Sequence, residues 1–280
     1  MRKYRKTSIS EDCNNNLEII QHSKPFKTVE KCHHIGKHRK NVFMYKYMDI
    51  ETAILCIKGA NIRFVEPTQW QDKYESRFYT ADYTKITTDK KLTPRLYACC
   101  FTFNKASEAA WRIYSYQKTG IASRCVQFRI KKQLFREALN KYAIENDCEV
   151  YEGPMNYDLD DYQIDHLHFK DHIVDESLFN TEFTRDHYLS LLLIKRSAFY
   201  YENEYRFFIT PNKQDMQSAI YPVINWSQMV DQVFVDKDCS DIEIEILTNY
   251  LVAAGININP VRKNLNQNPD KLIKFGDIDK

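Results

Sequence analysis

The sequence predicts an α+β fold in which helices pack on a mixed, mainly antiparallel sheet. Short segments rich in aromatic and β-branched residues are interspersed irregularly with helical patterns of unequal length. No internal repeat is visible along the chain. With 280 residues, of which 43% are hydrophobic and 28% charged, the chain is long enough to bury a large core.

Three regions are expected along the chain. Residues 1–40 are polar and include the basic run at positions 37–40, so they predict a loosely ordered N-terminal extension. Residues 41–265 carry the strand and helix patterns of a folded domain. Residues 266–280 are expected to form a polar C-terminal tail.

Alternating and 3.6-residue periodicities divide the first part of the domain into strands and helices. The strands are predicted at 42–47, 61–65, 96–103 and 123–130. The helices are predicted at 50–58, 107–117 and 131–146. Asp49 is the expected N-cap of the first helix, and Gly59 its end. Residues 69–75 are predicted to form a loop.

The second part of the domain continues the same pattern after an acidic loop at 157–165. A long helix is predicted over 169–195, followed by strands at 200–209 and 232–235. Ser240 caps a final helix that Gly255 closes.

Composition excludes several classes of protein. The chain has only 6 Gly and contains neither a phosphate loop nor a dinucleotide-binding glycine pattern. A formal net charge of +2 gives no strong case for nucleic acid. Eight cysteines without a C-x-x-C pair, behind a charged N-terminus, predict reduced thiols in a cytoplasmic protein. No apolar run approaches the ~18 residues of a membrane span.

Charged residues occupy every second position of the aromatic segment 200–209. In a strand, Glu202, Glu204 and Arg206 would share one face, and Asn203 and Tyr205 would take the other. Such a row is either a charge ladder on a wet sheet face or a prepared site for a polar ligand.

Residues of the kinds that bind metals, cysteine, histidine and aspartate, gather in two parts of the sequence. Cys32, His33, His34 and His38 lie in the N-terminal extension, and His166, His168 and His172 lie among aspartates. Neither spacing matches a standard zinc site, so no metal is expected.

Several separated segments together form a pattern that resembles the bacterial DUF2971 family, a domain of unknown function. They are Tyr45-Lys46-Tyr47, Ile62-Arg63-Phe64, Trp70 to Glu75, Cys100-Phe101-Thr102, Trp111-x-x-Tyr114 with Gly120, and Lys195 followed by Tyr201 to Arg206. The resemblance covers about residues 43–260. The chain departs from the family pattern at Gln71, where Asn is usual, and at Lys73, where Pro is usual, whereas Asp72 and Glu75 are kept.

The same order of segments is similar, at the level of the fold, to ADP-ribosyltransferase-like domains. That resemblance implies NAD as co-substrate, Glu204 as catalytic glutamate and Glu202 as its partner in a Glu-x-Glu pair. It implies a cofactor-binding set and a substrate loop around them. The cofactor-binding set is Tyr45, Arg63, Trp111, Tyr114 and Arg206, and the substrate loop contains Trp70, Asp72 and Glu75.

Three functions remain open at this point. The first is an ADP-ribosyltransferase-like effector of a bacterial toxin or phage-defence system, with a protein, nucleic acid or small molecule as acceptor. The second is a non-enzymatic module of a defence system that senses a nucleotide or a partner. The third is a nucleic-acid-binding protein that uses the basic residues of helix 131–146.

Overall fold

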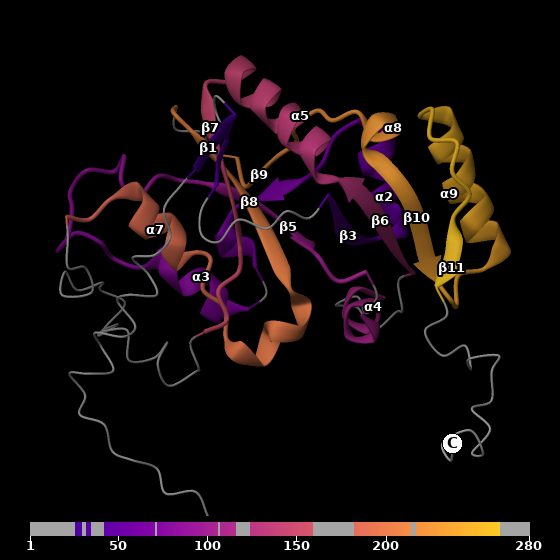
Figure 1. The fold of residues 1–280 in the computed structure, drawn as a ribbon, viewed down its shortest axis with the longest axis horizontal. Coiled ribbons are helices and arrows are strands. Elements are labelled where there is room, and N and C mark those ends of the chain that lie inside the picture. Colours follow the sequence, from indigo (N-terminus) through magenta and orange to yellow (C-terminus); the bar gives the residue numbers. More distant parts are fainter. Residues whose placement is uncertain are drawn as a thin grey trace, which may run out of the picture.

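One mixed sheet organises the molecule, and helices cover both of its faces, so the predicted α+β class is confirmed (Figure 1). The computed structural model describes residues 26–29, 32–34, 42–70, 72–105, 107–115, 124–158, 182–213 and 217–263. In these ranges, the pairs β2–β7 and β10–β11 are parallel and all other strand pairs are antiparallel.

The strands follow an order in space that differs from their order in the chain. From one edge to the other they are β1 (Phe26–Val29), β2 (Cys32–His34), β7 (Cys148–Pro154), β8 (Glu204–Pro211), β5 (Tyr97–Thr102), β3 (Phe43–Asp49), β6 (Cys125–Lys131), β10 (Val230–Asp236) and β11 (Val261–Lys263). A short branch adds β4 (Phe64–Val65) to β5, and β9 (Ala219–Ile220) to β4. The strand that carries the charged segment, β8, therefore lies inside the sheet.

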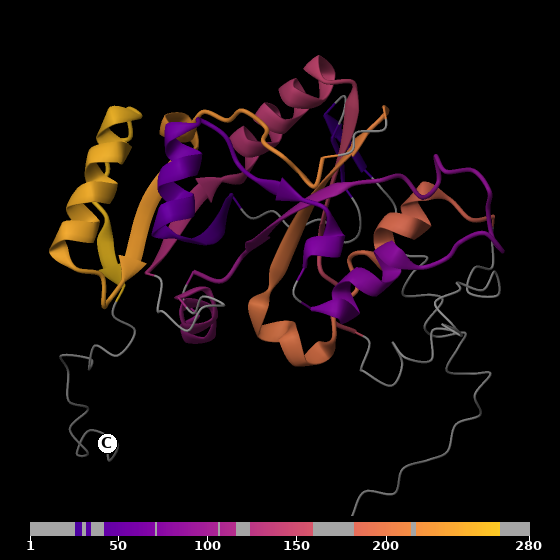
Figure 2. The ribbon, with the colours of Figure 1, turned by 180° about the vertical axis from the view of Figure 1, so that it is seen from behind.

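Helices connect the strands on both sides of the sheet. They are α2 (Ile50–Lys58), α3 (Lys73–Thr80), α4 (Glu108–Ser115), α5 (Lys132–Glu145), α7 (Arg185–Leu191), α8 (Trp226–Met229) and α9 (Asp241–Ala253), with the 3-10 turns η1 (Pro67–Gln69) and η3 (Ser197–Glu202). Both views place α4 and the turn before β8 along the same margin of the sheet (Figures 1 and 2). This margin carries the candidate site.

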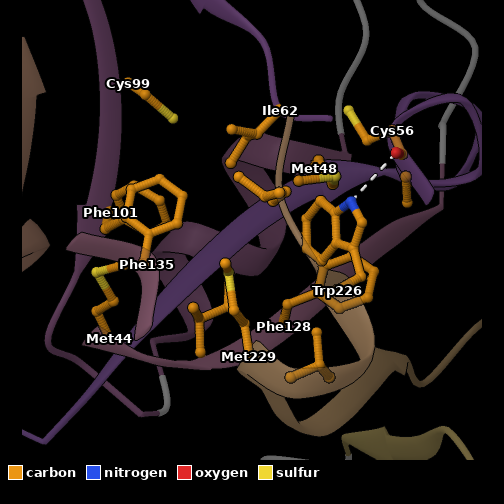
Figure 3. Packing of buried hydrophobic residues seen from close by; sticks show 14 of the residues in the cluster. Met44, Met48, Cys56, Ile62, Cys99, Phe101, Phe128, Phe135, Trp226 and Met229 are labelled. Carbon is orange, nitrogen blue, oxygen red and sulfur yellow. Dashed lines mark hydrogen bonds between the residues drawn. The ribbon is translucent and has the colours of Figure 1, made fainter. Parts of the chain in front are cut away.

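Two hydrophobic cores fix the sheet between its helices. The larger core packs β3, β5, β6 and β8 against α2, α5 and α9. Figure 3 shows its centre, where Trp226 packs beside Phe128 and donates from Nε1 to the carbonyl oxygen of Cys56 at 3.1 Å. The second core packs the other side of β5, β7 and β8 against α3 and α7. Because both faces of β8 are covered, its charged residues are held in a rigid and largely dry setting.

Local sequence signals placed several elements correctly. Helix α2 spans residues 50–58 as predicted, and the Asp49 carboxylate accepts from the backbone N–H of Thr52 at 2.7 Å. Helix α9 starts after a capping box between Ser240 and Glu243. The end of α9 is marked by Gly255, whose φ of 76° is left-handed.

Three predictions about the elements were wrong. Residues 73–75 are helical, not a loop, because Asp72 caps α3 by accepting from the backbone N–H of Tyr74 at 2.8 Å. The helix predicted over 169–195 ends at Leu191 as α7, and its residues 169–181 lie outside the described ranges. Strand β8 begins only at Glu204, because Asn203 turns the chain with a left-handed φ of 45°.

The N-terminal segment also differs from expectation. Strands β1 and β2 lie within residues 1–40, and β2 pairs in parallel with β7 from Cys32↔Val150 to His34↔Glu152. The boundary expected at residue 41 therefore falls after two strands of the same sheet. The C-terminal tail at 266–280 lies outside the described residues.

Candidate functional site

The register of three neighbouring strands builds one wall of the site. Tyr45 of β3 is opposite Thr102 of β5, and Thr102 is opposite Glu204 of β8. Directly opposed residues in antiparallel strands point to the same face of the sheet. An aromatic ring, a hydroxyl and a carboxylate therefore lie in one row, although they are far apart in the sequence.

A pocket of about 50 Å³ opens on this row. Helix α4 contributes Ala110 and Tyr114, and η3 contributes Tyr201 and Glu202. The complete lining, called the aromatic pocket below, is Tyr45, Tyr47, Cys100, Phe101, Thr102, Ser107, Ala110, Tyr114, Tyr201, Glu202 and Glu204. Aromatic side chains thus meet two carboxylates in one concave place, as is common in ligand sites.

Behind the carboxylates lies a cluster of five charged residues: Glu75, Lys195, Glu202, Glu204 and Arg206. Lys195 Nζ contacts all three carboxylates, at 2.9 Å from Glu75, at 2.8 Å from Glu204 and in a short contact with Glu202. Arg206 Nε lies 2.6 Å from Glu204, and its Nη2 makes a short contact with Glu75. This charge cluster contains three potential negative charges and two positive ones.

Backbone contacts hold the cluster in place. The N–H of Lys195 donates to the Asn156 carbonyl oxygen at 2.9 Å, and Asn156 donates to the carbonyl oxygen of Leu193 at 2.7 Å. Thr102 Oγ1 donates to the Glu202 carbonyl oxygen at 2.5 Å, which fastens η3 to the end of β5. The N–H of Glu204 donates to the Tyr157 hydroxyl at 2.9 Å. Lys195, Glu202 and Glu204 therefore project from anchored segments of backbone.

Arg206 is the most deeply buried member, with 1% of its surface exposed. Its Nη1 donates to the Leu192 carbonyl oxygen at 3.1 Å. The Trp70 ring covers the guanidinium, with a distance of 4.1 Å from Cζ to the ring centroid. These contacts explain why α3, α7 and the Trp70 segment all converge on β8.

The two glutamates of the pocket have different electrostatic surroundings. Burial alone would raise the pKa of Glu204, but Arg206 and Lys195 outweigh it and hold the pKa well below its ordinary value. Burial raises the pKa of Glu202, and Lys195 only partly opposes the increase. One carboxylate therefore stays ionised, whereas the other is poised to exchange a proton, which is a common division of roles in catalytic pairs.

Cys100 lies beside Glu204 in the pocket. Burial and the nearby Glu204 charge raise the pKa of its thiol well above the ordinary value. A protonated thiol is a poor nucleophile. Cys100 thus serves the site as a small neutral neighbour that hydrogen-bonds the Glu204 carboxylate.

Most of the sequence-predicted site residues come together here. Glu202, Glu204, Tyr45 and Tyr114 line the aromatic pocket. Arg206, Glu75 and Trp70 lie behind them, in or against the charge cluster. Asp72 adjoins this group, because its Oδ2 accepts from Arg196 Nη2 at 2.9 Å while it caps α3.

Two predicted residues lie elsewhere. Arg63 is exposed and its Nη2 donates to Gln69 Oε1 at 3.4 Å, away from the lining of the pocket. Trp111 is buried under Tyr47, with ring centroids 5.1 Å apart, and supports the pocket wall without lining it. Of the predicted cofactor-binding residues, Tyr45 and Tyr114 therefore line the pocket with Glu204, and Arg63 and Trp111 do not.

Sequence reasoning missed the role of Lys195, which connects the three carboxylates. Its position just after the buried apolar residues 191–194 was the available signal, because a lysine there must find partners. Tyr47, Cys100 and Thr102 were also missed as pocket residues. The alternation of residues in the predicted strands indicated which residues share a face of each strand. It did not indicate that Tyr45 and Thr102 lie opposite each other in the sheet.

The described residues contain no cluster of three or more metal-ligand side chains. The two histidine groups considered from the sequence lie outside what the structure describes of side chains. No helix within the described ranges is long and apolar enough to cross a membrane.

Comparison of the chain with protein-family models and with curated proteins finds no match. The resemblance to DUF2971 therefore stays a prediction.

Proposed function

We propose that the aromatic pocket and its charge cluster form the site of an ADP-ribosyltransferase-like enzyme that uses NAD. The observation that carries this proposal is the row of Tyr45, Thr102 and Glu204 across three strands, with Glu202 beside it in one pocket. A fixed carboxylate, a second carboxylate with a raised pKa and stacking rings are the groups that this reaction needs.

In the proposed reaction, the bond between C1′ of the ribose and the nicotinamide nitrogen breaks. Its electron pair leaves with nicotinamide, and the ribose passes through an oxocarbenium-like state that carries positive charge. Glu204 stabilises that charge, because Arg206 and Lys195 keep it ionised and hold it in place. Glu202 removes the proton of the acceptor as the acceptor bonds to C1′.

Glu202 is suited to proton transfer by its position as well as its pKa. Its side chain keeps 24% of its surface exposed and its Oε2 contacts Lys195. No hydrogen bond from the described residues reaches Oε1. One carboxylate oxygen is therefore open to a bound acceptor.

A second candidate is a non-enzymatic module that holds a nucleotide or a partner. The environment of Glu204 favours it, because Arg206 donates to it from Nε and Nη2, and Lys195 and the Cys100 thiol donate as well. A carboxylate offers about four lone-pair positions. A substrate hydroxyl would have to displace one of these donors, whereas a ligand that is only bound would not.

The two candidates are separated by measuring nicotinamide release from labelled NAD, and label transfer to cell extract. We expect Glu204→Gln to reduce release by a factor of about 100 or more, because a neutral amide cannot stabilise the oxocarbenium charge. The matched control is Glu245→Gln on the exposed surface of α9, which should leave release unchanged. Release that survives Glu204→Gln would exclude the proposed role of this residue.

The acceptor step is tested with Glu202→Gln. This variant should lose transfer while it retains slow NAD hydrolysis, since only the acceptor proton depends on Glu202. NAD binding without turnover in the wild-type protein would favour the sensing module. We further propose that the protein acts in a bacterial defence or toxin system. The six cysteines with described side chains are free thiols, which supports a cytoplasmic location.

A further inference from the structure

Aromatic residues form much of the lining of the aromatic pocket. Tyr47 and Tyr114 stack with ring centroids 5.4 Å apart and planes inclined by 8°. Tyr114 remains 47% exposed, so it is available to a ligand, and Tyr45 and Tyr201 complete the wall. The faces of aromatic rings carry partial negative charge and attract cations.

The carboxylates of the pocket also attract positive charge. Glu202 and Glu204 line it, whereas their counter-ions Lys195 and Arg206 lie behind them and do not. The three carboxylates of the charge cluster exceed its two cations by one charge when all are ionised. A ligand that enters therefore meets the rings and the two carboxylates directly. A further cation, Lys46, does not line the pocket, but its Nζ donates to the carbonyl oxygen of the lining residue Cys100 at 2.8 Å.

The volume of the aromatic pocket limits the size of the group that can enter it completely. A cavity of roughly 150 Å³ holds a benzene molecule, whereas this pocket holds about 50 Å³. A trimethylammonium head group and a pyridinium ring are both similar in size to benzene, so each would enter the pocket in part while the rest of the ligand stays outside.

We propose that the aromatic pocket selects its ligand by positive charge and takes a compact organic cation. The chemistry allows two sources, which are an alkylammonium head group and the pyridinium end of an oxidised nicotinamide nucleotide. Only the second source rests on the proposed function. A neutral ring of the same shape would lose the attraction of both the tyrosine faces and Glu202.

The test measures binding by calorimetry for pairs of probes that differ in charge but hardly in shape. The pairs are choline with 3,3-dimethylbutan-1-ol, N-methylnicotinamide cation with nicotinamide, and NAD with NADH. We expect the charged member of at least one pair to bind about five- to tenfold more tightly. Equal binding within every pair, or no binding of any cation, would overturn the proposal.

Variants assign the selectivity to the pocket. Tyr114→Leu removes an exposed ring and should abolish the preference for the cation, whereas Tyr114→Phe keeps the ring face and should retain it. Glu202→Gln should weaken the preference, and Glu245→Gln should not. Selectivity that survives both Tyr114→Leu and Glu202→Gln would place the cation elsewhere and overturn the proposal.

The outcome is separable from that of the proposed function. Choline selectivity without NAD binding would support the cation pocket and refute the NAD-dependent activity. NAD cleavage without any preference for cations would support the NAD-dependent activity and refute the cation pocket.

Discussion

At the scale of single residues, Lys195 decides whether the site can exist. Three carboxylates converge on its ammonium group, and only 6% of its surface is exposed. Burial alone would lower the pKa of Lys195, but Glu204 and Glu75 outweigh it and raise that pKa well above its ordinary value. The lysine therefore stays charged and allows Glu202 and Glu204 to lie side by side.

Replacing this lysine gives a stability prediction with a defined pH dependence. Lys195→Met should lower the free energy of unfolding by about 3–5 kcal/mol at pH 7, because it leaves Arg206 as the one cation of the charge cluster for three carboxylates. In the wild type, ionised Glu204 contributes stability above the unfolded pKa of about 4.3, and this contribution is lost as the pH falls. In the variant, burial raises carboxylate pKa values instead, so the difference between the two proteins should narrow toward pH 4.

Urea denaturation across that pH range measures the effect. The control is Lys141→Met on the exposed face of α5, where the lysine side chain is 76% exposed; it should cost less than about 1 kcal/mol at any pH. A loss for Lys195→Met that stays constant from pH 7 to pH 4 would contradict the electrostatic explanation.

At the scale of elements, the junction between η3 and β8 sets the relative positions of Glu202 and Glu204. Asn203 takes φ 45° and ψ 48°, which turns the chain so that Glu202 points back toward Lys195. Its side-chain amide donates to Asn104 Oδ1 at 3.2 Å. Asparagine tolerates this left-handed conformation better than most residues, which explains its presence at this position.

This junction can be tested with two substitutions. Asn203→Val should destabilise the protein by about 1–2 kcal/mol more than Asn203→Gly, because a β-branched side chain clashes in the left-handed region and glycine does not. Both variants lose the same hydrogen bond to Asn104, so their difference isolates the backbone. Thermal denaturation provides the measurement, and equal stability of the two variants would show that the turn is not strained.

At the scale of the whole molecule, the sheet extends beyond the region that carries the domain pattern. Strands β1 and β2 come from the N-terminal segment, and β2 covers the edge of β7. An uncovered edge of this kind exposes backbone donors and acceptors and can pair with another chain. These two described strands therefore belong to the sheet, although the composition of residues 1–40 is that of an extension.

Truncation provides the test at this scale. Removing residues 1–34 should lower the unfolding temperature and increase self-association, because β7 becomes an edge strand. Removing residues 1–24 leaves both strands in place and serves as the control. The two truncations are compared by thermal denaturation and light scattering, and equal behaviour would mean that β1 and β2 do not stabilise the sheet.

The sequence by itself determined the α+β class, helix α2 with its Asp49 cap, helix α9 with its Ser240 cap, and the face shared by Glu204 and Arg206. These features depend on side-chain periodicity and on hydrogen bonds between near neighbours in the chain, so local sequence specifies them. Only the tertiary structure decided that Tyr45, Thr102 and Glu204 lie in one row and that Lys195 joins Glu75 to Glu204. It also separated Arg63 from the pocket. These outcomes depend on strand order and register, which arise from packing between segments far apart in the sequence and leave no local pattern to read.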